Sequence, residues 1–243
     1  VVGSLLYLNN TTRPDLAFCA GVLGRCSGNF HDEHWKAAKK AWRYVKGTRD
    51  YGLTRGGGSW DEITVFTDAD YAGDLAERKS TTGIAIYLGE SLVSWKSMKQ
   101  QLTALSTTEA EMIAATEGAR EMLYTKQLLE EMHDETKVKC AMWCDNRATV
   151  DIVNNDTHQG RTKHLDTKYQ YVREVVSRNK IATMSHIRSE DMVADIFTKP
   201  LDRTKFQDFR WRMQVVPPMA YSLCAFTEHS EAYMNCPFDT LRD

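Results

Sequence analysis

Long apolar runs are missing from this sequence of 243 residues. No stretch approaches the ~20 consecutive apolar residues that a membrane-spanning helix needs, so we expect no membrane association. Residues 1–10 have neither a basic leader nor a small-residue cleavage site, which argues against a secretory signal peptide. The chain starts at Val1, in the middle of a predicted helix, and we interpret it as a piece of a longer protein.

Paired cysteine motifs are missing as well. The six cysteines show no CxxC spacing. Cys140 and Cys144 fall in one predicted strand, where four residues span roughly 13 Å, which is too far for a disulfide. The sequence therefore predicts free thiols in a reducing compartment.

A net excess of one charge is also missing, because 31 Lys and Arg residues oppose 33 Asp and Glu residues. The charges are nevertheless segregated: residues 1–60 carry nine basic against four acidic side chains, and residues 61–135 carry six against fifteen. A protein that binds a polyanion need not be basic overall if its basic groups face the strand and its acidic groups hold cations. The total charge therefore excludes neither a nucleic-acid partner nor a cation site.

The first 55 residues have the pattern of helices, and residues 32–48 are the clearest case. Trp35, Ala38, Trp42 and Val45 recur at helical spacing and predict one apolar stripe. The rest of that surface is basic, and its candidate nucleic-acid contacts are Lys36, Lys39, Lys40 and Arg43. Two interpretations stay open for these side chains, a solvated helix face and contact with backbone phosphates.

A glycine-rich break at residues 55–59 precedes a part of the chain with a different periodicity. The predicted elements there are strands at 62–68, 80–89, 91–97, 138–145 and 180–187, and helices at 106–133, 146–153, 162–178 and 190–200. Three consecutive strands followed by alternating helices and strands predict an α/β fold, with one five-stranded mixed sheet flanked by helices. We therefore divide the chain into a small helical segment (1–55), an α/β domain (60–201), and a C-terminal helix and tail of unknown role (202–243).

Acidic side chains stand at the ends of these elements. Asp68 ends the first strand, Asp145 ends the fourth, and Asp195 lies near the start of the last helix. Strand ends in a mixed sheet are where binding sites form. Carboxylates that converge there repel one another unless cations neutralise them, and Mg²⁺ suits such oxygen ligands. A pair of these ions can activate a water and stabilise the leaving oxygen of a phosphodiester.

Two glutamates, Glu109 and Glu111, lie at the start of the long helix at 106–133. Only one can face the sheet acids, because residues two apart differ by about 200° around a helix. Ser106 with Glu109 fits a capping box, which leaves Glu111 free on a face of small residues. Thr108 with Glu111 fits the same motif, so the alternative stays open.

Several motifs, in order along the chain, resemble the ribonuclease H region of copia-type retrotransposon polyproteins. They are FTDADYAGD (66–74), RKSTTGIAIYLG (78–89), SWKSMKQ (94–100), ALSTTEAEMIAATEG (104–118), CDN (144–146), RTKHLD (161–166) and ADIFTKPL (194–201). The preceding GSLLYLNNTTRPDLAF (3–18) and HWKAAKKAWRYVKGT (34–48) are similar to the segment that follows reverse transcriptase in those polyproteins. The sequence has no YxDD polymerase motif, so we expect the polymerase to lie upstream or to be lost.

This resemblance implies a ribonuclease H-like fold and hydrolysis of the RNA strand of RNA–DNA hybrids. It implies two Mg²⁺ ions, with Mn²⁺ as a possible substitute, and no small-molecule cofactor. The implied ligands are Asp68, Glu111, Asp145 and Asp195, with Asp68 shared by both ions. His186 matches a histidine that assists proton transfer or product release, and Asp70 is expected to face solvent in the turn after the first strand.

The partners implied are the RNA–DNA hybrid and the upstream reverse transcriptase domain, within a cytoplasmic virus-like particle. Basic residues of the RTKHLD motif and the next turn are expected to contact the nucleic-acid backbone; they are Arg161, Lys163 and Lys168. Three functions were weighed: an active hybrid ribonuclease, an inactive element remnant that binds nucleic acid without cleaving it, and another nuclease or integrase of the same fold. The complete set of four acids favours the first, and the chain order with its ADIFTK ending disfavours the third.

Overall fold

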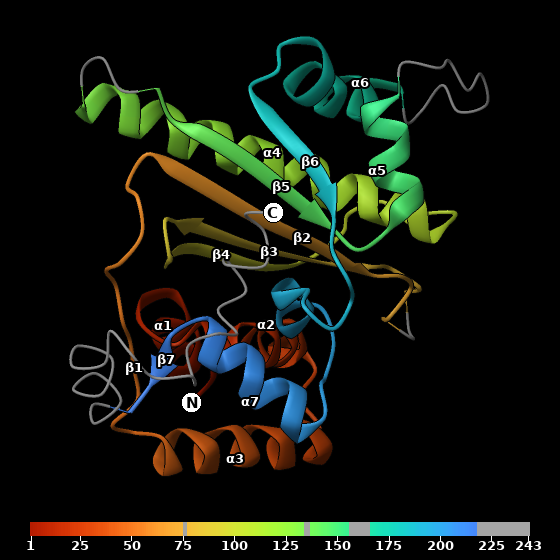
Figure 1. Ribbon diagram of the computed structural model, residues 1–243. Coiled ribbons are helices and arrows are strands. Elements are labelled where there is room, and N and C mark those ends of the chain that lie inside the picture. The colour runs from red at the N-terminus through yellow and green to blue at the C-terminus, as the bar shows by residue number, and fades with distance from the viewer. Residues whose placement is uncertain (75–76, 134–136, 156–165, 218–243) are drawn as a thin grey trace. The chain divides into compact units, whose positions relative to one another are not determined.

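The computed structural model describes residues 1–74, 77–133, 137–155 and 166–217, and only the backbone of residues 166–168. The chain divides into two compact units (Figure 1). One contains residues 1–55 and the chain from Pro200 onward, and the other contains residues 56–199. The sequence had suggested separate segments for residues 1–55 and 202–243, whereas the structure groups them.

The unit of residues 56–199 is built on a five-stranded sheet. Its strands are β2 (Glu62–Asp70), β3 (Thr81–Leu88), β4 (Ser91–Lys99), β5 (Lys139–Cys144) and β6 (Ala182–His186). The spatial order is β4-β3-β2-β5-β6; the β4/β3 and β3/β2 pairs are antiparallel, and the β2/β5 and β5/β6 pairs are parallel. This mixed sheet with flanking helices confirms the predicted ribonuclease H-like fold class.

Helices cover the sheet from one side (Figure 1). They are α4 (Thr107–Met132), α5 (Arg147–Asn154), α6 (Asp166–Arg173) and the π-helical segment η3 (Glu174–Arg178). Alternate strand residues such as Ile63 and Val65 pack against Met112 and Met122 of α4 in one buried cluster. This burial of apolar surface is the main force that holds the helices on the sheet.

Two glycines let neighbouring elements approach opposite faces of the sheet. A Cβ on Gly118 of α4 would lie 2.4 Å from Thr67 Cγ2, so this helix sits close to the centre of β2. A Cβ on Gly83 of β3 would lie 2.5 Å from the Ala194 carbonyl oxygen and 2.6 Å from Thr198 Cγ2. The short 3-10 helix η4 (Val193–Phe197) therefore rests directly on β3, on the face away from α4.

The described part of the other unit consists of helices and one short strand pair. Its elements are α1 (Val2–Thr11), η1 (Pro14–Leu16), α2 (Ala17–Arg25), η2 (Cys26–Gly28), α3 (Asp32–Gly47), β1 (Gly52–Leu53), α7 (Arg203–Arg212) and β7 (Val215–Val216). Leu5, Leu16 and Leu23 form its core with small residues of α3. β1 and β7 pair antiparallel, which ties the two ends of this unit together.

Three local predictions were wrong. The predicted helix at 190–200 is only the short η4, and β2 runs to Asp70, so that Asp68 lies inside the strand. Trp35 is 44% exposed, whereas Ala38 and Ala41 are the buried residues of α3. Within the described ranges, no helix combines the length and the apolar character that crossing a membrane requires.

Candidate metal centre

Three of the predicted acids come together near the carboxyl-terminal ends of β2 and β5. Asp68, Asp145 and Asp195 each offer a carboxylate oxygen, and these atoms all lie within 4.8 Å of one another. Asp68 and Asp195 are buried, and Asp145 is half-buried. Asp68 lies in β2, Asp145 directly follows β5, and Asp195 lies in η4. These elements are far apart in the sequence, so the fold is what brings the three acids together.

Asp68 is held in place from the side of the sheet that η4 covers. It pairs with Gly83 across the β2/β3 ladder, and the Thr198 hydroxyl donates a 2.6 Å hydrogen bond to its Oδ2. Burial and the nearby Asp195 carboxylate raise the pKa of Asp68 to about 7, although Lys199 and Thr198 oppose the rise. A charge on this carboxylate is therefore costly unless a cation approaches.

Lys199 supplies part of that positive charge. Its Nζ lies 2.8 Å from Asp195 Oδ1, four residues earlier in the chain. Burial by itself would lower the pKa of Lys199, but the carboxylates of Asp68, Asp195 and Asp145 outweigh it and raise the pKa. The single ammonium group of Lys199 therefore does not neutralise the three nearby carboxylates, and the centre keeps an excess of negative charge when these acids are ionised.

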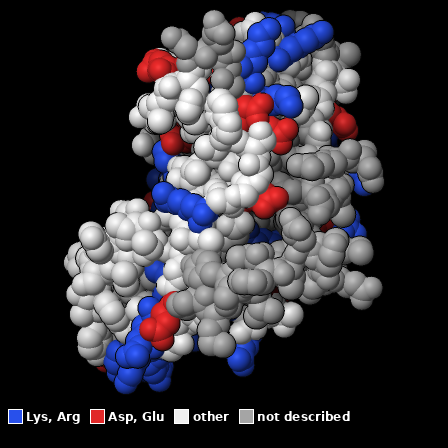
Figure 2. All heavy atoms as spheres, turned by 60° about the vertical axis from the view of Figure 1, so that its left-hand side comes forward, with Lys and Arg blue, Asp and Glu red and all other residues white. Residues whose placement is uncertain are grey.

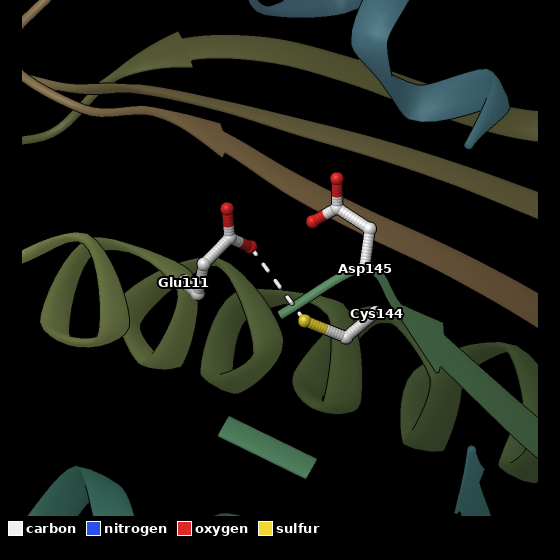
Figure 3. Close-up of side chains that lie close together, drawn as sticks. All are labelled: Glu111, Cys144 and Asp145. Carbon is white, nitrogen blue, oxygen red and sulfur yellow. Dashed lines mark hydrogen bonds between the residues drawn. The ribbon is translucent and has the colours of Figure 1, made fainter. Parts of the chain in front are cut away.

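Glu111 joins the acids from the helix side. Its Oε1 accepts a 3.1 Å hydrogen bond from the Ala69 N–H, and its Oε2 accepts one from the Cys144 thiol at 3.7 Å. Figure 3 shows the Glu111 and Asp145 carboxylates pointing to the same side, with the Cys144 sulfur turned toward Glu111. Ligand atoms of Glu111, Cys144 and Asp145 also lie within 4.8 Å of one another, so Asp145, rather than Asp68, is common to the two groups.

The protonation of this second group follows from its burial. Burial, Asp68 and Asp145 raise the pKa of Glu111 well above its usual value. Burial and Glu111 raise the pKa of the Cys144 thiol in the same way. Cys144 is therefore a neutral donor to Glu111, and the ligand set left for a cation consists of oxygens.

The start of α4 separates the two glutamates as the capping argument predicted. The Ser106 hydroxyl accepts from the Glu109 N–H at 3.1 Å, so Ser106 is the N-cap. Glu109 Oε2 accepts from the Leu105 N–H at 2.7 Å, one residue before the N-cap amide that the capping box predicts. Glu111 is buried beside the sheet acids, and Glu109 stays at the helix end.

Three further polar residues border the acids. The Ser189 hydroxyl donates to Asp145 Oδ2 at 2.7 Å, and His186 Nε2 lies 3.1 Å from the Asp145 carbonyl oxygen. Asp70 is half-buried at the end of β2 and does not lie in a solvent-exposed turn, contrary to expectation. Its own burial and the nearby Asp195 raise the pKa of Asp70, while Lys199 opposes the rise.

Sequence reasoning missed Thr198, Lys199 and Ser189. The signal for Lys199 was available, because it follows Asp195 by four residues, a spacing at which side chains of one turn meet. The other two had no local signal. Their hydroxyls reach Asp68 and Asp145 only through the tertiary fold.

The predicted nucleic-acid contacts are only partly described. The basic group on α3 is exposed and follows one helical stripe; it consists of Lys36, Lys39, Lys40 and Arg43. Figure 2 shows Lys and Arg side chains gathered at the lower edge of the molecule, at the height of α3 in Figure 1. Arg161 and Lys163 lie outside the described residues, as does the side chain of Lys168.

The donor set fits a hard divalent cation. Carboxylate oxygens predominate, and three of the four acids, Asp68, Glu111 and Asp195, are buried. Burial and crowding raise the pKa values of Asp68 and Glu111, as expected for a site that gains from added positive charge. Mg²⁺ and Mn²⁺ both prefer such ligands. The residues that would hold a cation are Asp68, Glu111, Asp145 and Asp195, and their oxygen ligands suit either ion.

Comparison with known proteins shows which proteins this chain is related to in sequence. The chain is 40% identical over 206 residues to the retrovirus-related Pol polyprotein from transposon TNT 1-94 of Nicotiana tabacum, which covers 85% of this chain and 15% of that polyprotein. The chain is homologous to a segment of retrotransposon Pol polyproteins. The chain spans only about 15% of the length of these polyproteins. No family model matches it.

The chain is also similar to a further curated protein and to a solved structure. Secreted RxLR effector protein 161 of Plasmopara viticola is 42% identical over 125 residues, which is 51% of this chain and 87% of that protein. Among solved structures, LC11-RNase H1 in complex with an RNA/DNA hybrid is similar with a TM-score of 0.43 and 14% identity, over 56% of this chain and 93% of that one. The fold assignment rests on the strand order and direction given above, not on this likeness.

Proposed function

We propose that this Pol segment is a metal-dependent nuclease that hydrolyses the RNA strand of RNA–DNA hybrids during reverse transcription. The observation that carries the proposal is the convergence of Asp68, Asp145 and Asp195, whose carboxylate oxygens lie within 4.8 Å of one another. Glu111 stands beside them and completes the set of four acids. The homology to Pol polyproteins agrees with such a role.

In this proposal the four acids hold two divalent cations. Bound there, the cations would activate a water for attack on phosphorus and stabilise the leaving 3′ oxygen. The surrounding residues orient the ligands: Thr198 fixes Asp68, and Ser189 fixes Asp145. The ring of His186 is anchored at the Asp145 carbonyl, where it can pass a proton or assist product release.

Nucleic acid would be gripped by the basic residues outside the metal centre. The exposed stripe on α3 offers charges that meet backbone phosphates, which position a strand without taking part in chemistry. We propose the same role for Arg161, Lys163 and Lys168. In the longer polyprotein the reverse transcriptase domain would be the neighbour of this segment, inside the virus-like particle of the element.

The test is cleavage of an RNA–DNA hybrid labelled on its RNA strand, with Mg²⁺ or Mn²⁺ and with EDTA. Asp145→Asn should lower the cleavage rate by at least about a thousandfold, because an essential group is lost. Asp151→Asn is the matched control, since Asp151 is exposed on α5 and outside the centre. It should stay within about twofold of the unchanged chain.

Binding of the hybrid, measured separately in EDTA, distinguishes the alternative. If the chain binds hybrid tightly but cleaves none with either ion, it is an inactive remnant that keeps only the binding function. If Asp145→Asn cleaves at the full rate, Asp145 is not part of the reacting centre.

A further inference from the structure

A second candidate site lies in the helical unit and uses none of the metal-centre residues. It is a cavity of about 340 Å³ formed by the end of α3 with the residues after it and by one face of α7. The α7 residues are spaced as one helical stripe, and the lining residues among those that the structure describes are Tyr44, Gly47, Thr48, Tyr51, Arg203, Phe206, Gln207 and Arg210. This volume is at the small end for ligand pockets, with room for one nucleotide and not for a duplex.

The aromatic wall of this cavity is fixed by buried contacts. The Tyr44 hydroxyl donates a 2.6 Å hydrogen bond to Asp15 Oδ2, and Asp15 forms a buried ion pair with Arg13 at 2.8 Å. The Tyr44 ring meets Phe206 edge-on, with 5.6 Å between ring centroids. Because these groups are held in place without a ligand, little ordering is needed when one binds.

The charge that faces the cavity is positive. Among the described lining residues, Arg203 and Arg210 are the charged ones, and neither forms an ion pair with another described residue. Arg210 lies over the Tyr51 ring at 4.6 Å, and its Nη1 donates to the Tyr44 hydroxyl at 3.3 Å. Its Nε is buried and has no hydrogen-bond partner among the residues that the structure describes.

The nearby acids do not cancel this charge. Asp202 caps α7 by accepting from the N–H groups of Thr204 and Lys205, and Asp208 pairs with Arg212 at 2.9 Å. Two arginines beside aromatic rings form the combination that binds an unpaired nucleotide, with the base stacked on a ring or guanidinium face and the phosphate on an arginine.

We propose that this cavity holds a single unpaired nucleotide of a nucleic-acid strand. Arg203, exposed at the first turn of α7, takes the phosphate, and Tyr51 with Arg210 gives the flat surface for the base. The site is separate from the proposed ribonuclease centre and does not require that centre to be active. It would give the Pol segment a hold on single-stranded nucleic acid.

The experiment measures binding of the full chain to a short fluorescein-labelled single-stranded DNA by anisotropy, in EDTA, at several salt concentrations. Arg203→Gln should weaken binding and flatten the dependence of log affinity on log salt by about 0.7, the value for one phosphate contact on a single strand. Arg25→Gln is the matched control, because Arg25 is exposed in the same unit and outside the cavity. Gln207→Glu, which adds a negative charge to the lining, should weaken binding without removing an arginine.

The base is tested with an abasic strand of the same length. Tyr51→Leu should weaken binding of the normal strand about fivefold or more, as expected for a lost stacking ring, and leave the abasic strand unaffected. Tyr51→Phe keeps the ring and should bind as the unchanged chain does. Equal slopes and affinities for Arg203→Gln and Arg25→Gln overturn the proposal. Equal affinity of the unchanged chain for normal and abasic strands, with competition by inorganic phosphate, also overturns it and leaves only an anion site.

Because these measurements need no metal, their outcome is independent of hybrid cleavage. A chain that cleaves hybrid but shows no effect of Arg203→Gln keeps the ribonuclease proposal and loses the nucleotide site. A chain that fails to cleave but shows the Arg203 and Tyr51 effects does the reverse.

Discussion

Two buried acidic centres in this molecule are built on opposite principles. In the helical unit, the fully buried carboxylate of Asp15 has its cation in the same fold, because Arg13 meets both of its oxygens at 2.8–2.9 Å. In the sheet unit, Asp68, Asp145 and Asp195 crowd together with one lysine, Lys199, between them. The first centre is balanced within the chain, and the second is not.

The difference shows which buried acids are structural and which are candidates for function. A matched pair holds the chain together, and breaking it leaves an uncompensated charge. Carboxylates that repel each other weaken the fold that contains them, and such strain is typical of sites that await a cation or substrate. Burial alone does not separate the two cases; the local charge balance does.

Breaking the balanced centre should have the largest effect on stability. Arg13→Met leaves Asp15 buried without its partner and should lower the free energy of unfolding by about 3–5 kcal/mol. Urea unfolding measures this change. Arg25→Met, at an exposed position of the same unit, should change it by less than about 0.5 kcal/mol. Similar losses in the two variants would show that the ion pair is not what stabilises this unit.

Removing an acid from the unbalanced centre should instead raise the free energy of unfolding. Asp68→Asn relieves repulsion, and in EDTA at pH 8 it should raise the free energy of unfolding by roughly 1–3 kcal/mol. Lys199→Gln removes the opposing cation and should lower it under the same conditions. If Asp68→Asn destabilises the metal-free chain, the crowded carboxylates are not a source of strain.

The same centre should make metal-free stability depend on pH. The pKa of Asp68 is raised to about 7 from an ordinary value near 4, so the folded chain keeps a proton that the unfolded chain releases. Stability in EDTA should therefore fall as pH rises from about 4 to about 7. Denaturation midpoints across this range measure the slope, which Asp68→Asn and saturating Mg²⁺ should both reduce. A midpoint that rises with pH in EDTA would contradict the prediction.

The smallest change in stability is expected at the start of α4, where two glutamates have different roles. Glu109→Gln weakens the contact with the Leu105 N–H and should cost at most about 1 kcal/mol, with hybrid cleavage retained. Glu111→Gln should abolish cleavage with little loss of stability, because burial and neighbouring acids already disfavour its charge. Loss of cleavage in Glu109→Gln with retention in Glu111→Gln would reverse the assignment.

Much of the sheet unit could be predicted because its signals are local. Strand periodicity, the turn at Gly89 and the Ser106 cap placed β2 to β6 and α4 close to where the structure has them. The predictions that were wrong concern segments whose structure depends on tertiary contacts. The apolar spacing around Asp195 predicts a longer helix, but this segment forms only a short 3-10 helix that packs on β3.

The helical unit shows the same limit. The two-residue strands β1 and β7 are too short to leave a periodic signal, and their pairing joins positions far apart in the sequence. Trp35 has the spacing of a core residue but is 44% exposed, because the smaller Ala38 and Ala41 make the close contact. Sequence patterns predicted which acids to consider, and the fold alone brought Thr198 and Ser189 to them.

Gly83 has a consequence for how related sequences are compared. It pairs with Asp68, and its missing side chain is the space in which Ala194 and Thr198 rest. A sequence with Gly83→Ala keeps every acid, but its new Cβ would lie 2.5 Å from the Ala194 carbonyl oxygen, so the segment that carries Asp195 would have to shift. A sequence comparison that counts only the acids would not detect this change. A glycine without a reactive side chain is therefore as informative in such a comparison as the carboxylates whose positions depend on it.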